Sequence, residues 1–456
     1  MRKDGFVQSF SSQPENGEAD LCLTEGSRVA VIGGGPAGSF FSYFLLEMSE
    51  RVHLDIQVDI YEPRDFSHKA PTGCNMCGGI ISETLVQYLA AEGINLPSTV
   101  VQRGIDSYMM HMDVGSSRID TPRQEKRIAA VHRGGGPRSV QEHRWDSFDG
   151  YLLSLALEKG AQLIPKRVTG LDWTDGKPQV QVRDGLPAEY DLLAVAIGVN
   201  SSASYLFKDT NFDYQPPGTT KTAIREYYLG MDTIGRYMDS SMHVFLLDLP
   251  RLEFAAIIPK GDFVTVCLLG KAIDNDLLKD FLNTPQARTC FPPDWHWDEP
   301  ACNCMPRINV HGSARPYGDR VVFIGDCGVS RLYKDGIGAA YRTAKAAAKT
   351  AVFHGVSEDD FARYFWPACK AIENDNNIGK FIFMVVRLIQ RFQFARRGVL
   401  RMVSSEQQNT NSNQRMSGVL WDTFTGSAPY QDVFLRTLHP AFMGSLLWNM
   451  VRSITR

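Results

Sequence analysis

Three glycines near the start of the chain have the spacing of a phosphate-binding turn. Gly33, Gly35 and Gly38 form a G-x-G-x-x-G pattern, with Pro36 and Ala37 between the last two. Glycine at these positions permits a tight turn, close approach of the backbone to a pyrophosphate, and close packing of a helix on a strand. A helix that begins here would offer its free N–H groups and positive dipole end to phosphates. The pattern therefore predicts a dinucleotide-binding turn.

The residues around this turn have the order of a βαβ unit. An apolar run precedes the glycines, an apolar helix pattern follows them, and a second strand, "LDIQVDIYE", ends at Glu62. The unit from Val29 to Glu62 has the expected length of about thirty residues. Glu62 is placed to accept the two hydroxyls of a ribose. We assign Arg64, two residues further on, to the same binding set.

A second junction of strand and glycine lies much further along the chain. The apolar strand 321–324 ends at Gly325-Asp326, and Gly336-Ile337 opens an alanine-rich helix. Nearly continuous apolar runs of this kind are typical of strands buried on both faces of a parallel sheet. We therefore expect this segment to return to the first sheet.

The pairing of G-x-G-x-x-G with a distal Gly-Asp resembles the flavoprotein hydroxylase and geranylgeranyl reductase superfamily. In that family the aspartate bonds the ribityl or pyrophosphate region of FAD. The later glycine-led helix points its N-terminus at the flavin pyrimidine. The resemblance implies FAD as the cofactor, with Gly325, Asp326, Gly336 and Ile337 among its contacts. It also places Lys334, just before the helix, where a positive charge could act on reduced flavin.

Other segments resemble the geranylgeranyl reductase branch in the expected order. The helix that begins near Arg144 resembles one whose arginine contacts the cofactor, and Cys77 begins a Cys-Gly-Gly segment. We therefore treat Cys77, with Lys334, as a catalytic candidate. Ile197 stands where the hydroxylases usually carry an aspartate, which argues against an aromatic hydroxylase. The segments are "CGGIISETL" (77–85), "RWDSFDGYLLSLALEKGAQL" (144–163), "AIGVNSS" (196–202) and "IIPKGDFVTVCLLG" (257–270).

The order of elements predicts an α/β fold. We expect a three-layer, Rossmann-like FAD-binding domain with an inserted antiparallel-sheet substrate lobe and a helical C-terminal extension. The predicted boundaries are a disordered tail (1–26), the first part of the FAD-binding domain (27–205), the substrate lobe (206–310), the return segment (311–352) and the extension (353–456).

Two cysteine pairs leave three interpretations open. Cys74 and Cys77 form a C-x-x-C motif, and Cys302 and Cys304 form a C-x-C motif. Four thiolates could hold zinc or an iron–sulfur cluster. A thiol pair beside the flavin is a second interpretation. Small buried residues around a cofactor loop are the third and the favoured one, so we predict no metal site. The glycines of "RGGGPR" (133–138) lack a preceding strand and a following apolar helix, which predicts a surface loop.

Composition excludes several classes of partner. The net charge of −3 gives no reason to expect nucleic acid, and 43% hydrophobic residues is the profile of a globular protein. The polar N-terminus has no apolar h-region, and the nine scattered cysteines indicate reduced thiols. We expect a cytoplasmic protein.

Residues 380–402 carry six basic residues and no acid, with apolar residues at helical spacing. This pattern suits either a helix at an anionic membrane surface, at the inner face of the membrane, or a helix packed on the sheet.

The predicted function is that of a flavin-dependent oxidoreductase of the reductase type. We expect hydride transfer between reduced flavin and an apolar substrate of isoprenoid, lipid or quinone type, with NAD(P)H as a candidate electron donor. A flavin-dependent monooxygenase and a non-catalytic flavin-binding sensor are the alternatives.

Overall fold

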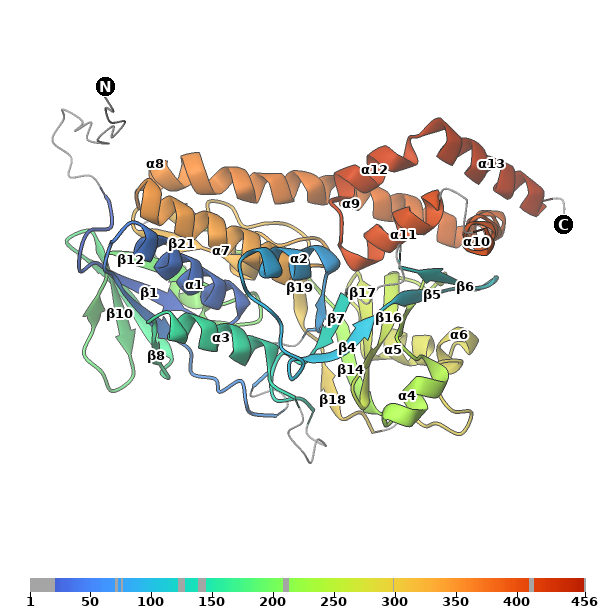
Figure 1. The fold of residues 1–456 in the computed structure, drawn as a ribbon, viewed down its shortest axis with the longest axis horizontal. Helices are drawn as coiled ribbons and strands as arrows, with labels where there is room; N and C mark the ends of the chain where they lie inside the picture. The colour runs from blue at the N-terminus through green and yellow to red at the C-terminus, as the bar shows by residue number, and fades with distance from the viewer. Residues whose placement is uncertain are drawn as a thin grey trace, which may run out of the picture.

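In the computed structural model, two large sheets form most of the fold, and helices bridge them (Figure 1). The structure describes residues 21–69, 73–74, 77–121, 128–137, 145–207, 213–297, 299–409 and 414–454. Of the tail predicted over residues 1–26, only 21–26 belong to this set. The Leu21 carbonyl accepts a hydrogen bond from the Val356 amide at 2.6 Å, so this part of the chain lies against the domain.

The first sheet has six strands and carries the glycine-rich turn. Its strands pair in parallel, except that β20 is antiparallel to β21. The distal strand β21 joins it beside β12, which in turn pairs with β1, so the expected return to the first sheet is confirmed. In spatial order the strands are β20 (Tyr317–Gly318), β21 (Val321–Phe323), β12 (Leu192–Val195), β1 (Arg28–Ile32), β2 (Gln57–Tyr61) and β8 (Gln162–Ile164).

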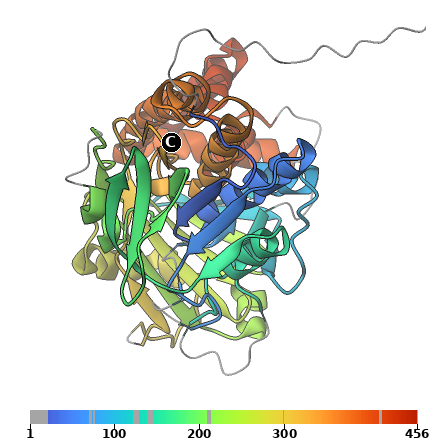
Figure 2. The ribbon, with the colours of Figure 1, turned by 90° about the vertical axis from the view of Figure 1, so that its left-hand side faces the viewer.

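Strand β1 is buried on both faces, and its alternate side chains enter two different cores. Val29 and Val31 pack with helices α1 (Pro36–Arg51), α3 (Phe148–Glu158) and α7 (Gly336–Phe353). Ala30 and Ile32 pack with the antiparallel meander on the other face. Figure 2 shows the meander and the helices α1 and α3 on opposite sides of the sheet. The predicted three-layer, Rossmann-like fold is confirmed. The meander consists of β9 (Val168–Thr174), β10 (Lys177–Val182) and β11 (Ala188–Glu189).

The second sheet has seven strands and forms the lobe. It recruits β5 and β6 from within the segment assigned to the first domain, so two stretches of chain build this lobe. Helices α4 (Met231–Tyr237), α5 (Asn275–Leu282) and α6 (Pro285–Arg288) accompany the lobe. Its strands, in spatial order, are β18 (Cys302–Cys304), β14 (Ala223–Tyr228), β17 (Phe263–Gly270), β16 (Leu252–Lys260), β15 (Ser241–Phe245), β5 (Ser107–Met112) and β6 (Gly115–Asp120).

Two small sheets and a helix connect the two large sheets. The first small sheet contains β3 (Ile80–Ile81), β7 (Ile128–Val131) and β4 (Val101–Ile105). Helix α2 (Glu83–Ala91) follows β3, and its N-cap residue Ser82 accepts a hydrogen bond from the Leu85 amide at 3.2 Å. The second small sheet pairs β13 (Thr219–Lys221) with β19 (Arg307–Asn309).

The C-terminal extension covers one face of the seven-stranded sheet. The Trp421 ring stacks on Tyr108 of β5 with ring centres 4.8 Å apart. None of the helices that the structure describes is both long and apolar enough to cross a membrane. The extension consists of α8 (Glu358–Asp360), a π-helical turn (Phe361–Phe365), α9 (Trp366–Arg391), α10 (Gln393–Gln408), α11 (Arg415–Thr425), α12 (Tyr430–Thr437) and α13 (Pro440–Ile454).

Candidate functional site

The glycine-rich turn has no room for side chains. A Cβ on Gly38 would lie 1.9 Å from the Gly33 carbonyl oxygen, and one on Gly33 would lie 2.6 Å from that of Ala196. Gly33 also has a φ of +108°, which L side chains rarely adopt. Helix α1 begins directly after Gly35, so its first N–H groups face the turn. The predicted geometry of an anion-binding turn is present.

Glu62 holds this turn from the end of the neighbouring strand. Its carboxylate accepts a hydrogen bond from the Gly34 amide at 3.0 Å and is 2% exposed. Arg64 pairs with the same carboxylate, with Nη2 2.9 Å from Oε2. The two residues assigned to cofactor binding therefore lie together beside the glycines. Their contact with a ribose stays a prediction.

The distal junction packs directly on the first turn. Gly325 has a φ of +65°, and a Cβ there would lie 2.6 Å from the Cβ of Ala37. Its amide donates to Thr343 Oγ1 on α7 at 3.1 Å. Burial raises the pKa of Asp326, while a hydrogen bond from Ser330 and the charge of Arg133 oppose that rise. Two sequence motifs far apart in the chain thus form one site.

Helix α7 begins beside Asp326. A Cβ on Gly336 would lie 3.7 Å from Asp326 Oδ1, and Ile337 is buried in the core shared with α1. The four residues that the resemblance assigned to the distal half of the site therefore converge. A Cβ at position 336 would make only ordinary van der Waals contacts, so this approach does not by itself require glycine.

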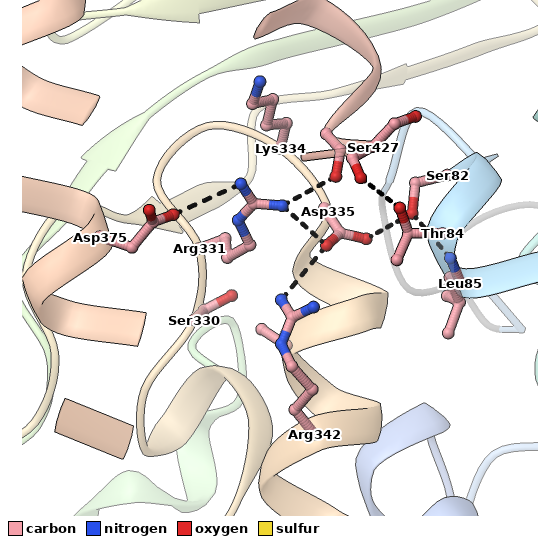
Figure 3. Close-up of polar contacts among 12 residues, drawn as sticks. Ser82, Thr84, Leu85, Ser330, Arg331, Lys334, Asp335, Arg342, Asp375 and Ser427 are labelled. Atoms are coloured by element: carbon pink, nitrogen blue, oxygen red, sulfur yellow. Dashed lines mark hydrogen bonds and ion pairs between the residues drawn. The ribbon is translucent and has the colours of Figure 1, made fainter. Parts of the chain in front are cut away.

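The residue that caps α7, Asp335, is the centre of a buried ion network (Figure 3). Its carboxylate accepts hydrogen bonds from Ser82 Oγ at 2.9 Å, Arg331 Nη1 at 3.1 Å and Arg342 Nη2 at 3.2 Å. Arg331 also donates to the Gly426 carbonyl at 2.8 Å. This network connects the N-termini of α2 and α7 to the C-terminal extension.

Lys334 points away from this network, toward the C-terminal helices (Figure 3). Its Nζ donates to the Asp422 carbonyl at 3.0 Å and lies 4.6 Å from the ring centre of Tyr430. Burial lowers the pKa of Lys334 well below that of a solvated lysine, and the charge of Arg331 adds to the decrease. A catalytic role for Lys334 stays a prediction.

Cys77, the other catalytic candidate, lines a small cavity between the lobe sheet and the segments that precede β3 and follow β7. All four cysteines of the C-x-x-C and C-x-C motifs line this cavity, although the motifs are far apart in the chain. The other residues of the lining are His132, Arg133, Gly134, Gly136, Ile224, Glu226 and Lys260. We call this the cysteine cavity.

Buried charges surround the cysteine cavity. The Lys260 side chain is 2% exposed, and its Nζ lies 3.1 Å from Glu226 Oε1. Arg133 forms a buried ion pair with Asp149, with Nη2 3.1 Å from Oδ2. Burial lowers the pKa of His132 to about 4, so its imidazole is neutral at pH 7. The cavity therefore combines thiols, one neutral imidazole and paired charges.

The prediction of a surface loop at 133–138 is wrong for its described part, 133–137. Arg133 is 9% exposed. A Cβ on Gly134 would lie 2.4 Å from the Gly73 carbonyl oxygen, and one on Gly135 would lie 2.0 Å from that of Ser67. The glycines thus permit close packing of two backbone segments, and they bring Arg133 to the cavity. Consecutive glycines after an apolar run were the available signal for such a contact.

The sequence did not single out His132, Arg133 or Glu226 as site residues, and Lys260 appeared only within a family-like strand pair. The predicted contact of Arg144 falls outside the described residues. The remaining predicted cofactor-binding residues gather around the two junctions.

No family model and no curated protein matches the chain. Solved structures do resemble it. A p-nitrophenol 4-monooxygenase, PnpA from Pseudomonas putida, matches with 10% identity and a TM-score of 0.57, over 89% of this chain and 99% of its own. A variant of the halogenase PltM in complex with FAD matches with 13% identity and a TM-score of 0.60, over 94% and 96%. A flavoprotein/dehydrogenase from Cytophaga hutchinsonii matches with 14% identity and a TM-score of 0.58, over 94% and 98%.

At these identities the likeness shows the fold alone. The chain shares the Rossmann-like architecture of these monooxygenase, halogenase and flavoprotein structures. The narrower resemblance to geranylgeranyl reductases stays a prediction. The residues present fit FAD: glycines allow the tight turn directly before helix α1, whose first N–H groups face the turn, and Asp326 is a buried carboxyl at the second junction.

Proposed function

We propose that the two junctions bind FAD noncovalently. The observation that carries this proposal is the contact between Gly325 and Ala37, which unites the G-x-G-x-x-G turn with the distal Gly-Asp. A turn that binds only a nicotinamide dinucleotide has no need of the second junction. The likeness in fold to a halogenase solved with FAD supports the same cofactor.

Each part of the site has a task in this proposal. The turn and the N-terminus of α1 bind the pyrophosphate through backbone amides. Glu62 orients the turn through the Gly34 amide and offers its carboxylate to the ribose. Asp326 binds the ribityl or pyrophosphate region, and the N-terminus of α7 approaches the pyrimidine ring. A helix terminus of this kind stabilises negative charge by about 0.3–1 kcal/mol when it is exposed and by up to about 2 kcal/mol when it is partly buried.

The proposed reaction is hydride transfer between reduced flavin and an apolar substrate of isoprenoid, lipid or quinone type. When bound, FAD supplies the redox chemistry, and the protein supplies orientation and electrostatics. NAD(P)H is the candidate electron donor. Cys77 lines the cysteine cavity together with three titratable side chains, those of His132, Lys260 and Glu226.

An apolar substrate agrees with the surface of the C-terminal extension. The inward face of α9 and α10 packs on the lobe, where Phe383 is 2% exposed. The outward face is apolar, with Leu388 48% exposed and Phe392 51% exposed; on α13, Trp448 is 60% exposed. Of the six basic residues in 380–402, Arg396 is buried and Arg387 pairs with Glu253. Arg391 is exposed, and Lys380, Arg397 and Arg401 are half-buried. We propose that this face contacts a membrane surface that holds the substrate.

Cofactor content tests the central proposal. The wild-type protein should purify yellow and release FAD on denaturation. Gly38→Ala should lose most of the flavin, because its Cβ would meet the Gly33 carbonyl oxygen. Gly418→Ala is the matched control: it places the same methyl group in a helix where nothing lies within 4 Å, so flavin content should stay at the wild-type level. A colourless wild-type protein that binds only NAD would reject FAD.

A flavin-dependent monooxygenase is the second candidate, because a p-nitrophenol 4-monooxygenase and a probable FAD-dependent monooxygenase are among the solved structures that resemble the chain. Oxygen uptake separates the two reactions. A reductase leaves the amount of oxygen consumed unchanged when substrate is added under turnover with NAD(P)H, or lowers it. A monooxygenase consumes one oxygen molecule for each product formed.

A further inference from the structure

The structure brings together two cysteine motifs, of which the proposed function uses Cys77 alone. Cys302 and Cys304 are alternate residues of β18, and side chains at such positions point to the same face of a strand. Their cross-strand partners on β14 are Glu226 and Ile224. All four of these side chains line the cysteine cavity, so this face of the sheet is turned toward it.

The C-x-x-C motif closes the cavity from the opposite side. A Cβ on Gly78 would lie 3.1 Å from the sulfur of Cys267 on β17, and one on Gly79 would lie 2.8 Å from Lys260 Nζ. The two glycines after Cys77 therefore allow this loop to lie directly on the lobe sheet. Cys74 and Cys77 reach the same cavity as a result.

We propose that Cys74, Cys77, Cys302 and Cys304 bind an iron–sulfur cluster. Four cysteine thiolates are the usual ligand set of both [2Fe–2S] and [4Fe–4S] clusters. The two motifs contribute two ligands each, from a loop and from a strand that fold onto each other. This inference does not depend on the reaction proposed for the flavin.

The spread of the thiols favours a cluster over a single ion. A mononuclear zinc site holds its sulfurs about 2.3 Å from the metal, which brings the ligand atoms close together. Among the described residues, only His111, His243 and Cys290 bring three candidate ligand atoms within 4.8 Å of one another. No three of the four thiols in the cysteine cavity lie within 4.8 Å of one another, which argues against a preformed site for a single ion.

Two neighbours of the thiols suit an anionic cluster. The Gly79 amide donates a hydrogen bond to Cys77 Sγ at 3.4 Å, and such bonds to ligand sulfurs tune cluster potentials. Arg133, which forms a buried ion pair with Asp149, lines the same cavity and places its guanidinium next to the thiols.

The cysteine cavity also lies close to the second junction. Arg133 is close enough to Asp326 to oppose the rise of its pKa, and Arg133 lines the cavity together with Cys74 and Cys77. The cluster would therefore lie next to the distal half of the proposed FAD site.

The test measures iron, acid-labile sulfide, zinc and FAD in the same samples of full-length protein. The protein is purified without oxygen, and one portion is reconstituted with iron(II) and sulfide. We expect about two or about four iron atoms and an equal amount of sulfide per chain, with an electron paramagnetic resonance signal on reduction. Cys74→Ser and Cys302→Ser should each lose the cluster, while Cys22→Ser, which alters an exposed cysteine outside the cavity, should retain it.

The cofactor measurements keep this inference separate from the proposed function. Gly38→Ala should lose FAD and retain iron, whereas Cys302→Ser should lose iron and retain FAD. One zinc per chain without sulfide, lost in the same cysteine variants, would replace the cluster with a zinc site. The proposal is overturned if neither metal binds after reconstitution, or if iron persists in Cys74→Ser and Cys302→Ser.

Discussion

Individual buried residues set how the protein responds to acid. His111 and His243 lie side by side in the lobe, with Nε2 and Nδ1 2.9 Å apart, and Cys290 Sγ lies 3.0 Å from the same Nδ1. Burial lowers the pKa of His111 to about 4. Burial, and then the neighbouring His111, lowers the pKa of His243 to about 3. Both imidazoles are therefore neutral in the folded protein at pH 5.

This neutrality predicts a loss of stability in mild acid. Between pH 6.5 and pH 4 the unfolded chain binds protons at these histidines and the folded chain does not, so the free energy of unfolding falls as the pH falls. For a pKa lowered from 6.5 to about 4, the loss between pH 7 and pH 5 is about 2 kcal/mol per histidine. Urea unfolding at both pH values should show this loss, and His111→Gln should reduce it. His53→Gln, at an exposed position, should leave the pH dependence unchanged; an unchanged dependence in His111→Gln would contradict the assignment.

At the site, the sequence predicted residues whose chemistry follows from their neighbours in the chain. Gly33, Gly38 and Glu62 belong to one βαβ unit, so local spacing was enough to find them. Glu226 and His132 meet the cysteine motifs only through the packing of two sheets. Nothing in their local sequence indicates that contact, and tertiary structure alone brings them together.

Among the elements, α7 depends on an ion network that no single segment contains. Arg331 donates to Asp335 at the start of α7 and to the carbonyls of Gly426 and Ala428 in the extension, at 2.8 Å and 2.9 Å. The helix start and the extension therefore share one guanidinium. A change in one is expected to reach the other.

Removal of this guanidinium should loosen both elements. Arg331→Met leaves two buried carbonyls without their donor and weakens the pairing of Asp335, and breaking a buried pair costs about 3–5 kcal/mol. Hydrogen exchange should accelerate at 426–437 and in the first turn of α7. Arg342→Met is the control, because Arg342 is more exposed and contributes a contact to Asp335; its exchange should change mainly in α7. Equal protection of 426–437 in Arg331→Met and wild type would contradict the coupling.

The elements themselves were largely predictable. Apolar strands next to glycine turns predicted β1, β2, β12 and β21, because buried parallel strands have this pattern. The recruitment of β5 and β6 into the lobe sheet was not predicted. β5 pairs in parallel with β15, which is distant in sequence, and no hairpin pattern in the sequence indicates such a pairing.

For the molecule as a whole, the apolar face of the extension predicts membrane attachment. Leu447 and Trp448 on α13 are 56% and 60% exposed, and Arg452 lies 5.3 Å from the Trp448 ring centre. The protein should float with anionic vesicles, and Trp448→Glu combined with Leu447→Glu should abolish flotation. Because few basic residues on this face are exposed, salt should weaken binding only partly. Leu186→Glu, at a 91% exposed leucine on the meander side, should float like wild type.

Other outcomes would assign this face differently. Loss of a dimer in the Trp448→Glu and Leu447→Glu variant, without any vesicle binding by the wild type, would make it a contact between two copies of the chain. Flotation that persists in the variant would place the membrane contact elsewhere.

The long helix α9 has a mechanical consequence. Its 26 residues span about 39 Å in one continuous piece, from the side of the six-stranded sheet to the lobe (Figure 1). Near its middle, Asn376 clamps the loop before α7, accepting from the Leu332 amide and donating to the Ser330 carbonyl, both at 2.8 Å. A continuous helix that is held near its middle in this way resists hinge bending between the six-stranded sheet and the lobe. A push on its outer end, where Leu388 is exposed, would instead be transmitted as a small tilt at Asn376, so that the proposed membrane attachment would adjust the loop beside the proposed FAD site.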